Sequence, residues 1–265
     1  MPNVKFPYQH ALVTGASSGI GASLCQALDL AGIETITLVA RRLDRLEKVA
    51  AGLSCSTRII KTDLQDLNAR EELVEQMETV DLLVNNAGFG SFGRFANADV
   101  EHQLDMVNLN CQAPLHLTGA VLPRMVRESH GCIVNISSGT AFQPMPYMST
   151  YAATKSFLLH WSEGLREELL GTGVRVVAIC PGTIHTEFAE TSKVPLAAIP
   201  GARLVTGSMS DLVGAIMAGI TKDKGVVIPG IGNFLGSFSS RFAPRILVRK
   251  LLAASLASAA KMIEE

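Results

Sequence analysis

The sequence predicts a single α/β domain with a doubly wound parallel sheet of about seven strands and helices on both faces. Its 265 residues are 48% hydrophobic and 18% charged, enough for one sizeable core but too few for two comfortable domains. Short apolar runs typical of buried strands alternate with longer segments of helical period. No internal repeat or low-complexity tract interrupts this alternation, so one domain is expected over 1–265.

Composition and charge narrow the classes of function. A formal net charge of -1 and a pI near 6.6 give no global basic field, so nucleic-acid binding is not expected. The sequence has neither a signal-peptide pattern nor an uncharged apolar run of about eighteen residues, so no membrane span is expected. The five cysteines lack CxxC spacing, and they are Cys25, Cys55, Cys111, Cys132 and Cys180. We expect them to be reduced core thiols, which favours a cytoplasmic location and no metal site.

The first strand is predicted over 10–14 and runs directly into a turn that contains Gly15, Gly19 and Gly21. A helical pattern follows over 20–30. Glycines let a backbone approach a pyrophosphate, and the free N–H groups and dipole of the helix N-terminus favour its charge. The turn therefore predicts a dinucleotide-binding loop, with an ordinary glycine-rich turn as the alternative.

The second strand, predicted over 35–40, ends at Arg41 and Arg42. An enzyme that uses NAD would carry an acid here for the adenosine ribose hydroxyls, whereas a guanidinium binds a 2′-phosphate through paired hydrogen bonds. The two arginines therefore predict NADP(H). The alternative is that they merely begin the charged helix predicted over 43–53.

The third and fourth strands are predicted over 57–61 and 80–84. The fourth runs into Asn85-Asn86-Ala87-Gly88, where small residues let the chain pass close to a ribose and the Asn amides can tie strands together. The next loop has three aromatic residues, interpreted either as an apolar substrate wall or as packing under the loop. They are Phe89, Phe92 and Phe95.

The fifth strand is the apolar run 131–138, which ends in hydroxyl groups. A long helix predicted to start near residues 149–150 brings Tyr151 back beside Ser138, and Lys155 lies one turn further along the same face. A phenol titrates near ~10 in water, so a fixed cation is needed before it becomes a useful proton shuttle. We expect Lys155 to lower the pKa of Tyr151. Alone, the pair also fits a solvated helix.

The last part of the sheet is predicted as strands over 174–180 and 225–228, with a helix over 210–221 between them. The segment 183–206 is rich in Ala, Pro and Gly, and it is interpreted as a mobile lid over the substrate or as a plain long loop.

A tail extends the chain beyond residue 240. From Pro244, apolar residues recur at helical spacing, which predicts an amphipathic helix of about four or five turns. Its apolar face must be buried against its own domain or substrate cleft, a second subunit or a membrane surface, and the protein surfaces are favoured. We expect it to shape the substrate entrance or a dimer contact.

Together these motifs resemble the NADP-preferring branch of the short-chain dehydrogenase/reductase superfamily. The residues that carry the resemblance are Thr14 to Gly21 (TGxxxGxG), Asn85 to Gly88 (NNAG), Ser138, and Tyr151 to Lys155 (YxxxK). The match runs in order from about residue 8 to about residue 230. The resemblance implies a Rossmann-like fold, an NADP(H) cofactor, a small-molecule carbonyl or alcohol substrate, and a homodimer or homotetramer.

The resemblance also implies the site residues. The catalytic group would be Asn110, Ser138, Tyr151 and Lys155. Asn110 lies in a helix predicted over about 99–128 and would hold a water that links the lysine to solvent. Asn108 competes for this assignment, and a helix-bend carbonyl is the alternative partner of either amide. Cofactor contacts are expected at Gly15, Ser17, Ser18, Gly19, Ile20, Gly21, Arg41, Arg42, Asp63, Leu64, Asn86, Ala87, Gly88, Tyr151, Lys155, Pro181, Gly182, Ile184 and Thr186.

The expected roles of Asp63, Ile184 and Thr186 also follow from the resemblance. Asp63 would hold the adenine edge, unless it caps the helix that follows. Ile184 and Thr186 would face the nicotinamide, and His185 between them is interpreted as incidental rather than as a general base.

The predicted activity interconverts a carbonyl and a secondary alcohol by hydride transfer, with Tyr151 donating the proton and Ser138 hydrogen-bonding the oxygen. Lys155 would also bind the nicotinamide ribose. The alternatives are an NADPH-binding regulatory protein without turnover and a nucleotide-sugar epimerase or dehydratase. A bulky apolar substrate is suggested by Phe89, Phe92, Phe95, Met145, Met148 and Phe188.

Overall fold

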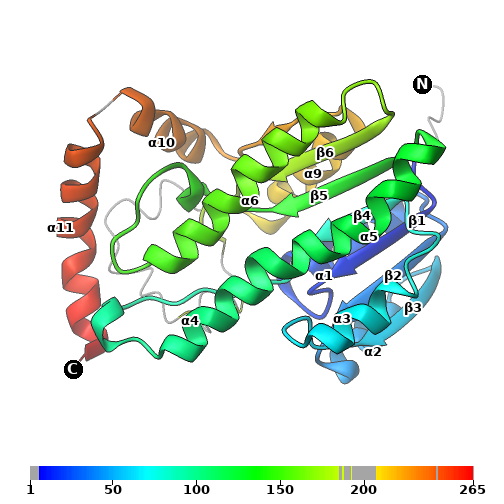
Figure 1. Cartoon of the computed structure of the whole chain (residues 1–265), viewed down its shortest axis with the longest axis horizontal. Coiled ribbons are helices and arrows are strands. Elements are labelled where there is room, and N and C mark those ends of the chain that lie inside the picture. The colour runs from blue at the N-terminus through cyan, green and yellow to red at the C-terminus, as the bar shows by residue number, and fades with distance from the viewer. Residues whose placement is uncertain (1–5, 185–186, 188–191, 193–206, 243, 265) are drawn as a thin grey trace.

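The computed structural model describes residues 6–184, 187, 192, 207–242 and 244–264. Seven parallel strands form one sheet in the order β3-β2-β1-β4-β5-β6-β7 (Figure 1). The strands are β1 His10–Thr14, β2 Thr35–Ala40, β3 Ser56–Lys61, β4 Leu82–Asn85, β5 Gly131–Ile136, β6 Val174–Ile179 and β7 Val226–Val227. This doubly wound, Rossmann-like sheet confirms the predicted fold class.

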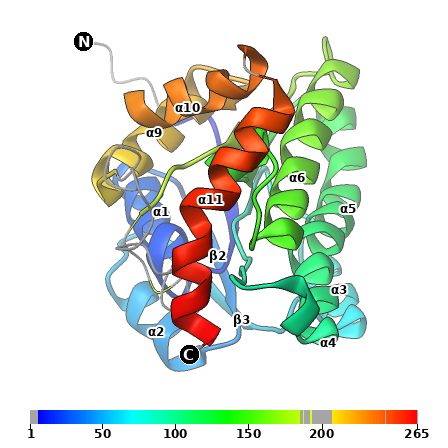
Figure 2. The same cartoon turned by 90° about the vertical axis from the view of Figure 1, so that its left-hand side faces the viewer.

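Helices cover both faces of the sheet. Helices α1, α2 and α9 pack on one face, and α3, α5 and α6 pack on the other (Figure 2). Their bounds are α1 Gly19–Leu30, α2 Leu43–Ala51, α3 Leu67–Val74, α4 Val100–Val107, α5 Ala113–Glu128, α6 Ser149–Glu168, α9 Met209–Thr221, α10 Ile231–Phe242 and α11 Arg245–Glu264.

The central strands are continuously apolar because they are buried on both faces. In β1, Ala11 and Val13 belong to the core under α1 and α9, whereas Leu12 between them belongs to the core under α5. Successive side chains of a strand point to opposite faces, so an alternating apolar and polar pattern would leave one of these cores unfilled.

The helices differ from the predicted ones in several respects. The helix expected over 99–128 contains a π-helical segment, Asn108–Gln112, between α4 and α5. Helix α10 was not expected. The residue that caps α3 is Asp66, whose carboxylate accepts the N–H of Asn68 at 2.9 Å, so the alternative that Asp63 caps this helix is wrong.

The predicted C-terminal helix is present as α11, which begins directly after Pro244. Figures 1 and 2 show α11, in red, standing across the carboxyl ends of the strands. Its buried residues Leu256, Ala259 and Ala260 pack with residues of α4 and α6. In this structure the second half of α11 is therefore covered by its own chain, whereas Ile246, Leu247 and Leu251 near its start are exposed.

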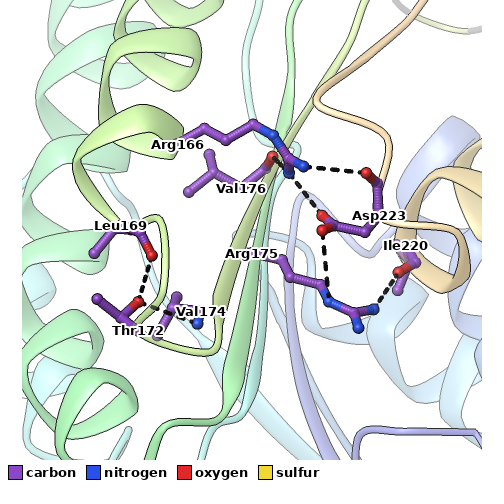
Figure 3. A network of polar contacts seen from close by, with 8 residues as sticks. All are labelled: Arg166, Leu169, Thr172, Val174, Arg175, Val176, Ile220 and Asp223. Carbon is purple, nitrogen blue, oxygen red and sulfur yellow. Dashed lines mark hydrogen bonds and ion pairs between the residues drawn. The ribbon is translucent and has the colours of Figure 1, made fainter.

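An ion-pair network connects α6, β6 and the turn after α9 (Figure 3). Arg166 of α6 pairs with Asp223, in the turn after α9, at 2.6 Å, and it also donates to the carbonyl of Val176 in β6 at 3.2 Å. Arg175 of β6 lies 4.0 Å from the same carboxylate. One acidic residue thus joins α6, β6 and the turn between α9 and β7.

Within the described parts of the chain, no helix is long and apolar enough to cross a membrane. All five cysteines are free, and all except Cys55 are buried.

Candidate active site

The glycine turn after β1 lies against the turn after β4, at the point where the strand order reverses. Gly15 has φ +66°, and a Cβ there would meet the Asn86 amide nitrogen at 2.8 Å and the Ala87 Cα at 3.0 Å. Gly19 also has a positive φ, of +54°, and a Cβ at Gly21 would collide with the carbonyl of Gly15. Glycine is required here because neither backbone leaves room for a side chain.

Polar contacts fix these two turns to each other. The Asn86 amide donates to the Thr14 carbonyl at 2.8 Å, and the Thr14 hydroxyl accepts the N–H of Asn86 at 2.9 Å and of Ala87 at 3.0 Å. At the end of β4, one residue before Asn86, the Asn85 amide donates to the side-chain oxygen of Asn135 in β5 at 2.8 Å. The expectation that the Asn amides tie neighbouring strands is confirmed.

The N-terminus of α1 faces this turn with its donors uncapped. Ser18 occupies the N-cap position, but its side chain makes no capping bond among the described residues, and the first turn of α1 contains no acid. Free N–H groups and an unopposed helix dipole suit an anionic ligand. The turn formed by Gly15, Gly19 and Gly21, called the cradle below, and this helix end therefore fit the pyrophosphate of a dinucleotide.

The two arginines after β2 point in different directions. Arg42 turns back to the glycine turn, where its Nη2 donates to the hydroxyls of Ser17 at 3.1 Å and Ser18 at 2.9 Å. Arg41 instead lies 3.7 Å from Asp63. Of the pair, Arg42 is placed beside the cradle, and its side chain does more than begin a solvated helix.

The segment after β3 is organised by a buried arginine. Arg70 donates to the Leu64 carbonyl at 3.0 Å and to the Asn108 side chain at 2.7 Å, and Asn108 in turn donates to the Gln65 carbonyl at 2.7 Å. Asn108 therefore braces this loop. The competing assignment of Asn108 to the proton relay has no support from its contacts.

The predicted hydroxyl pair does form a contact. Ser138, just after β5, hydrogen-bonds the side chain of Tyr151 in the first turn of α6, and only 7% of Tyr151 is exposed. Burial raises the pKa of Tyr151 to about 12, and the bond from Ser138 opposes this shift. The phenol is therefore protonated at neutral pH.

Lys155 lies beside Tyr151, with its ammonium over the phenol ring. Its ammonium donates to the Ile136 carbonyl at 2.8 Å and lies 5.8 Å from the centre of the Tyr151 ring. Burial lowers the pKa of Lys155 to about 8. The net shift of the Tyr151 pKa is upward, contrary to the expected lowering, because desolvation of the phenol by burial is the dominant cause.

Asn110 lies in the π-helical segment and is fully buried. Its amide donates to the Phe89 carbonyl at 2.9 Å and to the Thr154 hydroxyl at 3.0 Å, and its oxygen accepts the Phe89 N–H at 3.2 Å. It thus connects the loop after β4 with α6, near Lys155. Its partners are not helix-bend carbonyls, and the water relay stays a prediction.

An apolar cluster surrounds the ring of Tyr151. Phe92, Met106 and Met148 form it together with the three buried residues of α11, and Phe89, Met145 and Tyr147 pack against its edge. Phe95 is 59% exposed and lies outside the cluster. Phe188 falls outside the described residues. The aromatic loop therefore supplies packing beside the tyrosine through two of its three rings.

The turn after β6 lies next to Ser138. The Pro181 carbonyl accepts the N–H of Gly139 at 2.7 Å, and Asn233 of α10 donates to the Cys180 carbonyl at 2.8 Å. Ile184 packs at the edge of the core under α1. His185, Thr186 and nearly all of the predicted lid 183–206 lie outside the described residues.

Two supporting residues were missed by the sequence analysis. Thr154 donates to the Tyr151 carbonyl at 2.7 Å and receives the Asn110 amide, and Asn233 anchors the turn beside Ser138. Thr154 stands inside the YxxxK motif, where its helical spacing could have placed it beside Asn110. Asn233 gave no such signal, because it lies in a helix that was not predicted.

The sequence of this chain matches a known protein family and curated relatives. The sequence profile of the short chain dehydrogenase family matches residues 9–195. A probable NADP-dependent dehydrogenase of Haemophilus influenzae is 37% identical over 186 residues, which cover 68% of this chain and 73% of the relative.

Solved structures agree with this family match. A short-chain dehydrogenase from Sphingobium yanoikuyae in complex with NADPH superposes with a TM-score of 0.77 at 29% identity, over 88% of this chain and 94% of that one. The bulky-bulky ketone specific alcohol dehydrogenase from Comamonas testosteroni gives a TM-score of 0.72 at 28% identity, over 89% and 93% of the two chains.

Proposed function

Because this chain belongs to the short-chain dehydrogenase/reductase superfamily, we propose that it is an NADP(H)-dependent oxidoreductase that interconverts a carbonyl and a secondary alcohol on an apolar substrate. The observation that carries the proposal is the buried, protonated Tyr151, which is hydrogen-bonded to Ser138 and set in an apolar cluster at the carboxyl ends of the strands. Ligands of open α/β sheets bind at this edge.

The residues present fit an NADP-type dinucleotide. Gly15, Gly19 and Gly21 keep the cradle open, the α1 N-terminus offers its N–H groups, and Arg42 lies beside Ser17 and Ser18. When bound, the nicotinamide supplies or accepts the hydride. The Haemophilus relative and the NADPH complex of the Sphingobium enzyme support NADP(H) as the cofactor.

The proton chemistry follows from the environment of Tyr151. With a pKa near 12 the phenol holds its proton at neutral pH, so it can donate that proton to a substrate oxygen as the carbonyl is reduced. Ser138, already hydrogen-bonded to the phenol, is placed to donate to the same oxygen as negative charge develops. Below pH about 8 the Lys155 ammonium is charged and would stabilise the phenolate left behind.

The substrate side supports an apolar ketone or acyl chain. Phe92, Met148 and Leu256 pack around the tyrosine and offer no charged partner to a substrate. The ketone-specific Comamonas enzyme shares the fold and supports the same substrate class. The tail helix α11 thus acts as one wall of the site.

A screen of NADPH consumption across ketones, 3-oxoacyl thioesters and steroids tests the proposal. We expect NADPH to be oxidised with at least one apolar carbonyl compound and the matching alcohol to be recovered. NADPH binding without consumption across the whole panel would contradict the proposal and favour an NADPH-binding regulatory protein.

Two further properties belong to this proposal. The five free thiols support a reducing, cytoplasmic compartment. A homodimer or homotetramer is proposed from family resemblance, and light scattering of the purified chain would test it.

A further inference from the structure

A carboxylate of the chain itself binds the arginines beside the dinucleotide cradle. Glu187 Oε2 lies 2.9 Å from Arg42 Nη1, and its other oxygen contacts Arg45 Nη1. Arg42 precedes α2 and Arg45 lies in the first turn of that helix. These two guanidinium groups hold the pKa of Glu187 below its usual range. A single anion thus bridges two cations at this point.

The two terminal nitrogens of Arg42 contact different groups. Nη2 is held by the hydroxyls of Ser17 and Ser18, in the glycine turn, whereas Nη1 faces the carboxylate. Arg41, the neighbouring arginine, is directed to Asp63. The cations that converge on an anion beside the cradle are therefore Arg42 and Arg45, and the sequence analysis did not include Arg45 in the cofactor site.

We infer that Arg42 and Arg45 together form the site for the cofactor 2′-phosphate and that Glu187 competes for this site as an internal anion. The inference rests on the proposed function, since it assumes that an NADP-type dinucleotide occupies the cradle. It assigns two residues, Arg45 and Glu187, to the choice between the phosphorylated and unphosphorylated cofactors.

A phosphate monoester can displace this carboxylate for two reasons. It has about 1.5 to 2 negative charges at neutral pH, against one for a carboxylate, and three acceptor oxygens that suit paired contacts with two guanidinium groups. The side chains of Arg42, Arg45 and Glu187 are 41%, 39% and 42% exposed, so water and salt screen their existing ion pairs. The carboxylate is therefore a weak competitor, which lowers NADPH affinity without blocking it.

NADH offers no phosphate to replace Glu187. Its binding leaves the Glu187 ion pairs with Arg42 and Arg45 intact, so a change at position 187 should leave NADH affinity almost unchanged. The competition is specific to the phosphorylated cofactor.

The test compares dissociation constants of NADPH and NADH, measured by fluorescence titration or calorimetry on the full chain without substrate. Glu187→Gln keeps the size of the side chain and removes its charge. We expect it to tighten NADPH binding about three- to tenfold and to change NADH binding less than about twofold. Asp44→Asn is the matched control, because it also removes one negative charge near Arg45. Asp44 lies in the first turn of α2.

Arg45→Ala supplies the second arm. It should weaken NADPH binding about tenfold or more, through loss of charged hydrogen bonds, and leave NADH binding unchanged. Arg41→Ala, its matched control, should have a smaller effect. Raised salt should shrink the gain from Glu187→Gln, since screening already weakens the competing ion pairs.

The outcomes separate this inference from the proposal beneath it. If the unmodified chain binds NADPH no more tightly than NADH, the NADP(H) assignment itself fails. If NADPH is preferred but Glu187→Gln does not exceed Asp44→Asn, or Arg45→Ala does not exceed Arg41→Ala, then this inference alone is overturned.

Discussion

At the scale of single residues, burial decides the protonation states on which the proposed chemistry depends. Tyr151 and Lys155 are both almost inaccessible to solvent. Burial raises the pKa of Tyr151 and lowers that of Lys155, and both shifts favour the uncharged form of the side chain. The YxxxK spacing predicts that the two side chains are neighbours. It does not reveal that the ammonium donates to Ile136, because that contact depends on where β5 ends relative to α6.

The lowered pKa of Lys155 leads to a prediction about pH. Above pH about 8 the lysine loses its proton, and a neutral amine no longer stabilises the phenolate that forms when Tyr151 donates its proton. The value of kcat/KM for carbonyl reduction, which reports the free enzyme, should therefore fall as pH rises through this range. Thermal unfolding at each pH controls for lost structure. A profile that stays flat to pH about 10 would show that the ammonium is not required.

Gly88 gives a second residue-scale prediction. A Cβ at this position would meet the Asn110 side-chain oxygen at 2.8 Å and the Lys155 ammonium at 3.5 Å. Gly88→Ala should therefore displace Asn110, lower the free energy of unfolding by about 1–3 kcal/mol and weaken NADPH binding. Denaturant unfolding and a binding titration measure both effects.

Gly119→Ala is the control for Gly88→Ala. This glycine lies within α5, and a Cβ there meets no described atom within 4 Å. The change should be neutral or should stabilise the protein by up to about 1 kcal/mol, since alanine favours helix. Equal behaviour of the two variants would contradict the close packing proposed around Gly88.

At the scale of elements, the strands were the most predictable feature and the helix irregularities the least. All seven strands were predicted, although β5 ends before Ser137 rather than including Ser137 and Ser138. The π-helical turn at Asn110 has no signature in side-chain periodicity, because it depends on contacts with Phe89 and Thr154. Helix α10 was missed although its Asn233 anchors the turn at Cys180.

The packing of α11 against the site can be tested with one substitution. Leu256 is 1% exposed and belongs to the cluster around Tyr151. Leu256→Ala should lower the free energy of unfolding by about 2–5 kcal/mol and shift activity toward bulkier substrates, because it leaves a cavity beside the tyrosine. Leu251→Ala makes the same change at a position that is 60% exposed, and it should cost less than about 0.5 kcal/mol. Similar losses in both variants would contradict the proposed packing.

The Asp223 network predicts how acid affects stability. Its bond to Arg166 lowers the pKa of Asp223 below the ordinary 3.8, so the folded state binds this proton less readily than the unfolded chain. The stabilisation is present above pH about 4 and is lost as pH falls through the folded pKa.

Asp223→Asn tests this network, and asparagine tolerates the positive φ of 51° at this position. At neutral pH the variant should lose about 1 kcal/mol or less of unfolding free energy, since the carboxylate is 39% exposed. Urea titrations should show this difference shrinking below pH about 4. A difference that is constant over the whole pH range would rule out the ion pair as its source.

At the scale of the whole molecule, the site is assembled at one edge of the sheet from segments far apart in the sequence. The glycine turn follows β1, the Asn86 turn follows β4, and Ser138 and the start of α6 follow β5. They meet because parallel strands end on the same side. The order of motifs predicted this meeting. The sequence left open whether the tail helix covers the substrate entrance or a dimer contact, because an amphipathic helix does not specify the surface that buries it.

The central claim is that Tyr151 donates the proton in an NADPH-dependent carbonyl reduction. The most direct test measures NADPH affinity and carbonyl turnover in the same preparations of unmodified chain and Tyr151→Phe. We expect the variant to bind NADPH within about twofold of the unmodified chain and to lose about 10²- to 10⁴-fold in turnover, the range for a general acid. A Tyr151→Phe variant that reduces the carbonyl at close to the unmodified rate would contradict the account.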